Sequence, residues 1–433
     1  MMLSAGLGFI IALALIFVRV PIAIALAVVG FVGYAMLNSL SPAFSVMGLT
    51  AMGSTMSYNL AVVPLFILMG NLVAGAGISQ ELYRAAQVFV GHRRGGLGIA
   101  TVLSCGGFAA VCGSSVATAV TMGRVAIPSM RSYGYADSLS TATVAAGGTL
   151  GILIPPSIIM VIYGITTETH IGMLFAAGII PGLIGVAGYA AAVNWVARRH
   201  PDRAPRAERA TGPEKRHALK NVWAVCALFI LVLGGIYGGF FTATEASGIG
   251  ACGALVFAIM RRTPLRELVQ IMRISAETTA ILFALIIGAS VFSEFVNLTG
   301  AHQGVLAVVR DGNLSPVMVM VVICLIYVLL GCVLDSLAMM LLTLPMFFPI
   351  VVGLGFDPIW FGIMVVMLVE IGLITPPIGM NLFVLKSILP DVRLITIIQG
   401  VVPFIAVDIL RILLIALIPA LTLFLPGLFF GPS

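Results

Sequence analysis

The sequence Gly151-Ile-Leu-Ile-Pro-Pro156 returns 221 residues later as Gly372-Leu-Ile-Thr-Pro-Pro377. The same offset relates residues outside the motif, since Ser115 corresponds to Ser336. A long region is therefore duplicated. Each proline pair removes two backbone donors and forces the preceding residues out of helical conformation, so both copies predict a broken helix.

The chain is strongly apolar, because 61% of its 433 residues are hydrophobic and only 9% are charged. At least ten apolar runs approach the length of about 20 residues that crosses a bilayer as a helix, which predicts an all-α polytopic membrane protein. A broken helix is tolerated in a membrane only where it is buried or lines a cavity, and duplicated breaks are typical of secondary transporters. The first segment, Leu3–Phe17, lacks a basic flank and a cleavage pattern and is expected to remain as a helix.

Enzymatic motifs are missing from the sequence. It has no GxxxxGK[ST] phosphate loop and no HExxH metal motif, and its five histidines fall at the ends of apolar runs or in loops. The six cysteines lie in apolar runs without the spacing of metal ligands. We therefore expect no enzymatic activity, and we assign the net charge of +6 to membrane orientation rather than to a nucleic-acid partner.

Basic residues predict the orientation in the membrane. Residues 198–220 carry eight Lys and Arg side chains and are placed in the cytoplasm by the positive-inside rule. Of the 22 Lys and Arg residues, the resulting topology leaves only Arg310 in an outside loop and Arg411 within a span. Both termini then lie outside. This topology requires residues 98–127 and 316–350 to enter and leave the membrane on one side, as reentrant hairpins.

The two hairpins open from opposite sides of the membrane, which predicts an inverted repeat. The repeats and their parts are a first repeat 1–197, with the hairpin 98–127 and a broken helix 136–166, a basic cytoplasmic connector 198–220, and a second repeat 221–433, with the hairpin 316–350 and a broken helix 358–389. Two short segments of mixed polarity, Ile78–Val90 and Pro264–Ser275, are expected to be interfacial helices. As interfacial helices, these two segments would connect a moving part of the protein to a stationary part.

The helix breaks are the candidate binding sites. A helix that stops within the membrane leaves unpaired N–H groups at one end and C=O groups at the other. Carbonyl and hydroxyl oxygens suit Na⁺, and helix N-termini suit a carboxylate, so the pattern indicates cation-coupled transport of an organic anion. The small residues at the first tip, Gly113, Ser114 and Ser115, have close helix packing as an alternative explanation.

Four of the ionisable residues in apolar runs are candidates for a specific role. Asp335, at the tip of the second hairpin, is expected to bind a cation or to reach water. Glu370 precedes the second break, where it would either orient the loop or take part in coupling. Asp408 and Arg411 are three residues apart, and we expect them to form an ion pair within the last span.

Four sequence blocks occur in an order that is typical of one transporter family. They are Val111-Cys-Gly-Ser-Ser-Val-Ala-Thr118, Gly148-Thr-Leu-Gly-Ile-Leu-Ile-Pro-Pro-Ser157, Leu342-Thr-Leu-Pro-Met-Phe-Phe-Pro349 and Gly372-Leu-Ile-Thr-Pro-Pro-Ile-Gly-Met-Asn-Leu-Phe383. Through them the chain resembles, over nearly its whole length, the large membrane subunit of a tripartite ATP-independent periplasmic (TRAP) transporter.

The resemblance implies an elevator-type transporter of the bacterial inner membrane that carries an organic acid with Na⁺ as the coupling ion. It implies two protein partners, a small four-helix membrane subunit and a periplasmic substrate-binding protein. Since the chain starts at the first large-subunit helix, the small subunit is expected to be a separate polypeptide. By position, the family's two Na⁺ sites correspond to Gly113, Ser114 and Ser115 with Gly148, Thr149 and Gly151, and to Asp335 and Ser336 with Gly372 and Thr375.

The resemblance leaves the substrate open among C4-dicarboxylates, sialic acids and related carboxylates. The residues expected to contact it are neutral hydrogen-bonding groups: Ser115, Thr118, Thr149, Ser157, Thr375 and Asn381. The main alternative is a Na⁺- or H⁺-coupled organic anion carrier of the same architecture that acts without a binding protein. A passive channel, which would show flux without saturation or counter-ion dependence, is a second alternative.

Overall fold

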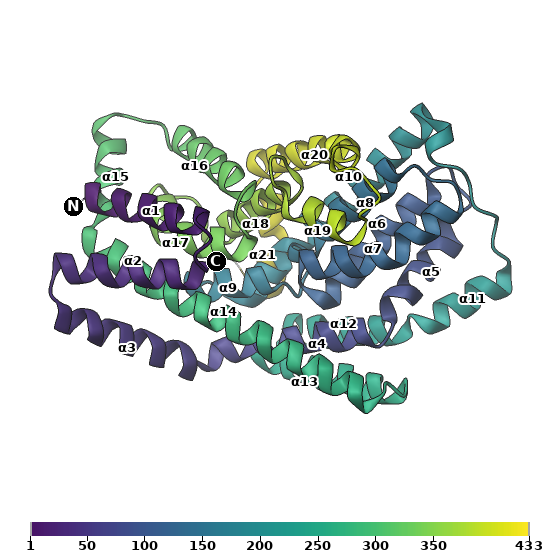
Figure 1. Cartoon of the computed structure of the whole chain (residues 1–433), viewed down its shortest axis with the longest axis horizontal. Coiled ribbons are helices and arrows are strands. Elements are labelled where there is room, and N and C mark those ends of the chain that lie inside the picture. The colour runs from purple at the N-terminus through teal and green to yellow at the C-terminus, as the bar shows by residue number, and fades with distance from the viewer. Residues whose placement is uncertain (1, 432–433) are drawn as a thin grey trace.

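The computed structural model describes residues 2–431, and all regular secondary structure in that range is helical (Figure 1). In the first half of the chain the helices are α1 (Met2–Phe17), α2 (Ile22–Leu37), α3 (Leu40–Met56), η1 (Tyr58–Ala61), α4 (Val62–Gly75), α5 (Ile78–Val90), α6 (Gly96–Cys112), α7 (Ser115–Ser132), α8 (Asp137–Thr149), η2 (Leu150–Ile152), α9 (Ile158–Thr166) and α10 (Ile171–Arg199).

In the remainder they are η3 (Pro201–Arg203), α11 (Gly212–Asn221), α12 (Trp223–Tyr237), α13 (Ala243–Met260), α14 (Leu265–Thr299), α15 (Ala301–Asp311), α16 (Pro316–Gly331), α17 (Ser336–Gly353), α18 (Pro358–Ile374), α19 (Met380–Ile388), α20 (Leu394–Leu417) and α21 (Ala420–Phe430). The predicted all-α fold class is therefore confirmed for the described residues.

Many of these helices have the length and composition of membrane spans. Within residues 2–431, six helices pass both criteria, and a seventh is added if α11 and α12 are joined across their bend of 43°. Six shorter apolar helices of 10–17 residues accompany them, and three of these, α6, α16 and α18, stop at a helix break. Exposed apolar side chains cover the outside of the molecule, as expected where lipid is the solvent.

The first structural group is a layer of long helices, which we call the frame: α2, α3, α4, α13 and α14. Helix α14 packs against α2, α3 and α4, and α13 packs against α4. Figure 1 shows these helices side by side in the lower half of the view. The closest approach is between α2 and α14, where a Cβ added to Gly30 would lie 2.6 Å from the backbone nitrogen of Phe292. Such contact between backbones is typical of tightly packed membrane helices.

The second group, which we call the bundle, contains the paired short helices α6 to α9 and α16 to α19, together with α10 and α20. Its members pack on one another across the two halves of the sequence, as α7 does on α19 and α8 on α20. Gly400 of α20 touches the backbone oxygen of Ser138 at the start of α8, so no side chain would fit there. The largest hydrophobic core runs through both groups.

One expected element differs in the structure. Ile78–Val90 is a separate helix, α5, which begins after Gly77 in the left-handed conformation (φ 76°). Residues Pro264–Ser275, by contrast, do not form a short interfacial helix, since they lead into the single 35-residue helix α14. The prediction of a second separate helix is wrong because residues 265–287 contain neither glycine nor proline, and nothing ends the helix.

Candidate functional site

The turn between α6 and α7 is built by three small residues. Helix α6 ends at Cys112, and Gly113 follows with a positive φ of 63°, which only glycine adopts without strain. Ser114 is the N-cap of α7 and accepts a hydrogen bond from the Ala117 backbone nitrogen at 3.4 Å. The Thr118 hydroxyl donates to the Ser114 carbonyl at 2.7 Å. Thr118 therefore holds the turn from within α7.

The first proline pair separates α8 from α9. Ser157 caps α9, because its hydroxyl donates to the Ile152 carbonyl at 2.6 Å and accepts from the Met160 nitrogen at 3.4 Å. Gly151 lies against the turn between α6 and α7: an added Cβ would be 2.8 Å from the Ser114 carbonyl oxygen. The break in α8–α9 and the α6–α7 turn are thus in direct contact, and Gly148 likewise packs on Ala119 of α7.

A helix cap and a close glycine contact also occur in the second half. Asp335 is the N-cap of α17 and accepts from the Leu337 nitrogen at 3.3 Å, while the Ser336 hydroxyl lies 3.4 Å from its other oxygen. Gly372 packs on Gly331 at the end of α16, where an added Cβ would be 2.6 Å from the Gly331 carbonyl carbon. The end of α16 therefore packs directly against the second break.

One hydrogen-bond cluster joins the two halves. Asn381 of α19 is fully buried, and its amide nitrogen donates to the Ser115 hydroxyl oxygen at 2.8 Å and to the Ala145 carbonyl at 3.0 Å. Ser115 begins α7, and Ala145 lies in α8. A single side chain of the second half thus binds both broken elements of the first half.

A cavity of about 390 Å³ lies between both turns and the frame. Its polar lining comes from Gly113, Ser114, Ser115, Asp335, Ser336, Asn71 and Thr278. The first turns of α7, α9 and α17 all line it, so three helix N-termini meet at one space. This volume suits a small organic ligand. Helix N-termini carry partial positive charge, and Asp335 is the only charged side chain among the lining residues.

The sequence-predicted residues divide into two sets in the structure. Five of them line this cavity: Gly113, Ser114, Ser115, Asp335 and Ser336. The others support its walls or face elsewhere: Thr118, Gly148, Thr149, Gly151, Ser157, Gly372, Thr375 and Asn381. The Thr375 hydroxyl donates to the Ile371 carbonyl at 2.5 Å within its own helix.

Two polar lining residues come from the frame and were not predicted from the sequence. Asn71 of α4 donates to the hydroxyl of Ser275 at 2.9 Å, which ties α4 to α14 beside the cavity. Thr278 follows one turn later in α14. The available signal was a polar amide in the otherwise apolar helix α4.

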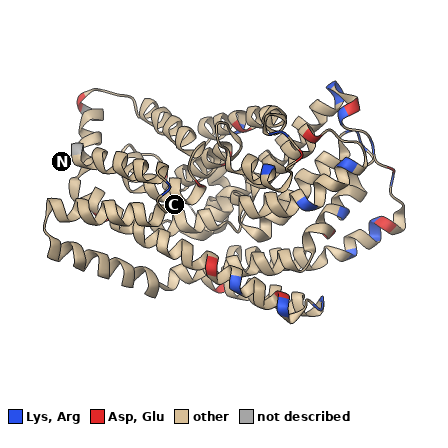
Figure 2. Cartoon of the chain, in the orientation of Figure 1, with Lys and Arg blue, Asp and Glu red and all other residues tan. Residues whose placement is uncertain are grey.

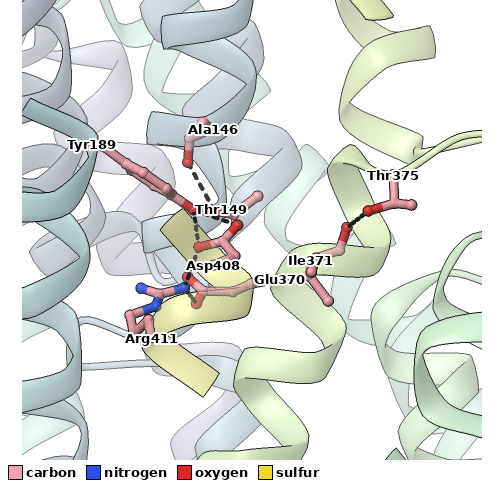
Figure 3. A network of polar contacts seen from close by, with 8 residues as sticks. All are labelled: Ala146, Thr149, Tyr189, Glu370, Ile371, Thr375, Asp408 and Arg411. Carbon is pink, nitrogen blue, oxygen red and sulfur yellow. Dashed lines mark hydrogen bonds and ion pairs between the residues drawn. The ribbon is translucent and has the colours of Figure 1, made fainter. Parts of the chain in front are cut away.

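A buried ionic network lies next to the first break (Figure 3). The Nη2 atom of Arg411 donates to Glu370 at 2.5 Å and to Asp408 at 2.8 Å, and all three side chains are almost completely buried. The predicted pair of Asp408 and Arg411 is therefore confirmed. The second carboxylate, Glu370 of α18, joins it from another helix.

Tyr189 extends the network to α8. Its hydroxyl donates to Asp408 at 2.7 Å and lies 3.2 Å from the hydroxyl of Thr149, which itself donates to the Ala146 carbonyl at 2.8 Å. Figure 3 shows Thr149 directed toward Tyr189, whereas Thr375 lies apart from the network. The hydroxyl of Thr149 thus connects the first break to α10 and α20.

A second ionic cluster closes the bundle at one end. Arg131 of α7 bonds Asp137 and Asp391, each at 2.6 Å. The hydrogen bond that Arg131 donates to Asp137 raises the pKa of Arg131, as does the one it donates to Asp391, despite some desolvation. The guanidinium of Arg131 in turn lowers the pKa of Asp391. This cluster links the start of α8 to the loop before α20.

The chain is similar to known transporter subunits along nearly all of its length. The family model "Tripartite ATP-independent periplasmic transporter, DctM component" matches residues 9–421. The C4-dicarboxylate TRAP transporter large permease protein of Pseudomonas aeruginosa is 37% identical over 86% of both chains. The sialic acid TRAP transporter large permease protein of Vibrio cholerae is 31% identical over 97% of both chains. These relatives are permeases, not enzymes.

A solved structure shows the same fold. The YdaH transporter of Alcanivorax borkumensis superposes with a TM-score of 0.62 over 91% of this chain and 90% of its own, at 16% sequence identity. Since the family model covers nearly all residues and relatives above 30% identity cover most of each chain, this polytopic membrane protein belongs to the DctM family, the large permease subunits of tripartite ATP-independent periplasmic transporters.

Proposed function

We propose that the chain performs Na⁺-coupled uptake of an organic acid, which a periplasmic binding protein delivers, by an elevator movement of the bundle along the frame. The observation that carries this proposal is the meeting of three helix N-termini at one cavity of about 390 Å³. Backbone N–H groups at a helix N-terminus attract and bind carboxylates. The cavity therefore suits an organic anion without any arginine or lysine in its lining.

Asp335 supports a role for a cation. A carboxylate that lines the same cavity repels an organic anion unless a positive charge lies between them. Na⁺ prefers hydroxyl, carboxylate and carbonyl oxygens, and Ser336 lies 3.4 Å from Asp335. In the first half, the turn around Ser114 and the neighbouring Gly151 offer backbone oxygens at the equivalent place. Bound Na⁺ would supply positive charge there, and these residues would hold it.

Two Na⁺ sites, one in each half, follow from this arrangement. The first would use Gly113, Ser114 and Ser115 with the backbone of residues 148–151, and the second Asp335 and Ser336 with the backbone around Gly372. The hydroxyls of Thr149 and Thr375 already bond to carbonyls of their own helices. Because a hydroxyl that donates its proton keeps its oxygen lone pairs, we propose that both threonines can still contribute a side-chain oxygen to Na⁺.

The position of the cavity supports an elevator mechanism. One wall is made by the frame, through Asn71 of α4 and Thr278 of α14, and the opposite wall by both turns of the bundle. A ligand bound to the turns would move with the bundle past the frame. The turns α6–α7 and α16–α17 would act as reentrant hairpins within two inverted repeats, 1–197 and 221–433, with both termini on the periplasmic side of the inner membrane.

The names of the relatives support the substrate class. Three of them are described as permeases for C4-dicarboxylate, sialic acid and 2,3-diketo-L-gulonate, which are carboxylates. As in other tripartite systems, the partners would be a small four-helix membrane subunit and a periplasmic binding protein. We propose that this chain takes a related carboxylate from such a binding protein.

Uptake into proteoliposomes tests the function. The chain is reconstituted with its small subunit, and entry of labelled organic acids is followed with and without the binding protein, under an inward Na⁺ gradient. Each Na⁺ entering down 100 mV contributes about 2.3 kcal/mol, and two ions would offset the equal electrical cost of moving a dianion inward, so the Na⁺ concentration gradient would drive accumulation. We expect accumulation only when Na⁺ and the binding protein are both present.

The controls separate the parts of the proposal. A K⁺ gradient of the same size should give no accumulation. Uptake that requires Na⁺ but not the binding protein would instead assign the chain to a stand-alone type of carrier. Uptake that is driven by a pH gradient and is indifferent to Na⁺ would contradict the proposed coupling ion.

A further inference from the structure

A basic cavity, which shares no lining residue with the cavity between the two turns, lies at the end of α10. It has a volume of about 820 Å³, and its charged and polar lining consists of Arg93, Arg94, Arg198, Arg206, His92 and Asn194. Figure 2 shows Lys and Arg gathered toward this side of the molecule. The loop between α5 and α6, the end of α10 and the connector each contribute at least one arginine.

The positive charge of this cavity has no internal counter-charge. Among the described residues, the four lining arginines take part in no ion pair, whereas Arg131 and Arg261 both pair with carboxylates. The Nδ1 atom of His92 is buried and has no hydrogen-bond partner. Desolvation, followed by the charges of Arg209, Arg93 and Lys215, lowers the pKa of His92. The arginines without ion-pair partners therefore give the cavity a positive charge that favours an anionic ligand.

An apolar groove adjoins the basic cavity. It has a volume of about 650 Å³, lies between α10 and α20 and is lined by side chains such as Ile184, Leu410 and Leu414. Ala191 lines both spaces, so the groove and the basic cavity meet there. Trp195 borders the groove with 55% of its surface exposed, and Arg199 lies 5.7 Å from the centre of its ring.

This combination matches one kind of molecule. Tryptophan beside basic residues is typical of the boundary between acyl chains and headgroups, so the basic cavity lies at headgroup level. Arginine binds phosphate oxygens in a bidentate manner, and basic pockets beside membrane helices bind anionic lipids. A soluble anion would fill the basic cavity but would leave the groove between α10 and α20 without an occupant.

We infer that this surface is a binding site for an anionic phospholipid, whose phosphate is held by Arg93, Arg94, Arg198 and Arg206 and one of whose acyl chains lies in the groove between α10 and α20. The lipid would fix the rim formed by these two helices at the membrane surface. The inference rests on charge and shape alone, and it does not depend on which ion drives transport.

Fluorescence of Trp195 tests the inference with the full chain in lipid nanodiscs. Brominated phosphatidylglycerol and brominated phosphatidylcholine are supplied at equal mole fractions, and the Trp195 signal is taken as the difference from the Trp195→Phe variant. We expect stronger quenching by the brominated anionic lipid. The double variant Arg94→Gln, Arg198→Gln should reduce this preference by roughly fivefold for each arginine removed.

The matched control removes two arginines that do not line the cavity, Arg216→Gln and Arg266→Gln, and should keep the preference. Ala191→Phe blocks the junction without changing charge and should reduce the preference as well. Equal quenching by both lipids, or an equal loss in the control variant, would show diffuse surface attraction and overturn the site. Inorganic phosphate, but not chloride of equal ionic strength, should weaken the preference, because it competes for the same arginines. If phosphate binds these arginines while both brominated lipids quench equally, the cavity is a free-anion site and the lipid assignment is wrong.

Discussion

Asn381 and Ser115 lie 266 residues apart in the sequence, yet the Asn381 amide donates to the Ser115 hydroxyl at 2.8 Å. The same amide nitrogen donates to the Ala145 carbonyl at 3.0 Å. Asn381 therefore fixes the start of α7 against α8 from the opposite half of the chain. Its position four residues after Pro377 places this contact between the two halves next to the second break.

The first prediction concerns this amide. Asn381→Ala should destabilise the folded protein by about 1 kcal/mol, because its buried hydrogen bonds with Ser115 and with the Ala145 carbonyl are lost, while the helix still partners that carbonyl. Asn381→Asp should cost more, since a carboxylate oxygen would face that carbonyl. Thermal unfolding in detergent measures both. In a double-mutant cycle, the coupling of Asn381 with Ser115 should be about 0.6 kcal/mol, the usual value for hydrogen bonds in membranes.

A control for that measurement is available on the same helix. Ser387 is exposed, and its hydroxyl only donates to the Val384 carbonyl of its own helix at 2.7 Å. Ser387→Ala should leave the unfolding temperature nearly unchanged and should not couple to Ser115. A loss of stability in Ser387→Ala as large as that in Asn381→Ala would contradict a special role for the link between the halves.

The second prediction concerns the buried network of Arg411. Arg411→Met leaves Glu370 and Asp408 buried without a counter-charge, and such a change typically costs about 3–5 kcal/mol. Glu370→Gln should cost less, because the glutamine oxygen can still accept from Arg411. Unfolding of both variants is compared with that of Arg273→Met, which breaks an exposed pair and should change stability by about 0.5 kcal/mol or less.

Gly185 gives an independent check on the same network. An added Cβ there would touch the Nη1 atom of Arg411, so Gly185→Ala should displace the guanidinium from Glu370. If both Gly185→Ala and Arg411→Met are as stable as the parent protein, the network makes no contribution to the fold.

The sequence predicted the local parts of this architecture better than the long-range ones. Spacing along one helix was sufficient to predict the pair of Asp408 and Arg411, because residues three apart share a helix face. Glu370 joins this pair only because α18 packs on α20, and no spacing rule connects positions 370 and 411. The same limit applies to Thr149 and Tyr189, which meet through the packing of α8 on α10.

The interfacial segments show a second limit of sequence patterns. The mixed polarity of Ile78–Val90 and Pro264–Ser275 predicted the same kind of short helix for both. Only the first has a glycine at each end, Gly77 and Gly91, where the helix stops. The second continues into α14 without interruption. Likewise, Asn71 and Thr278 line the cavity because the frame packs on the bundle, and the repeated motifs contain no information about that contact.

The third prediction concerns the contact of Gly372 with Gly331. Gly372→Ala would place a methyl group 2.6 Å from the Gly331 carbonyl carbon, and backbone atoms cannot move aside as a flexible side chain can. We expect a reduced yield of folded protein, measured by monodisperse elution in detergent. Gly48→Ala is the matched control, since an added Cβ there has no neighbour within 4 Å, and it should elute like the parent protein.

The fourth prediction tests Asp335 as a cation ligand. Asp335→Asn keeps the size of the side chain and one oxygen that accepts from the Leu337 nitrogen, but it removes the charge. The Na⁺ concentration for half-maximal uptake should rise about tenfold, which corresponds to the loss of about 1.4 kcal/mol of binding. Asp357→Asn is the matched control, because Asp357 also caps a helix, α18, and does not line the cavity.

Ser115 completes this test from the other half of the chain. Ser115→Ala removes a hydroxyl that lines the cavity and is expected to weaken Na⁺ activation without preventing folding, since Asn381 keeps its bond to the Ala145 carbonyl. Comparing Asp335→Asn with Ser115→Ala and with Asp357→Asn distinguishes a role in cation binding from a role in helix capping. If Na⁺ activation of uptake is unchanged in both Asp335→Asn and Ser115→Ala, neither turn binds the coupling ion. If Asp357→Asn shifts the Na⁺ dependence as much as Asp335→Asn does, the effect arises from loss of a helix cap. Asp335 would then stabilise α17 and would not bind the ion.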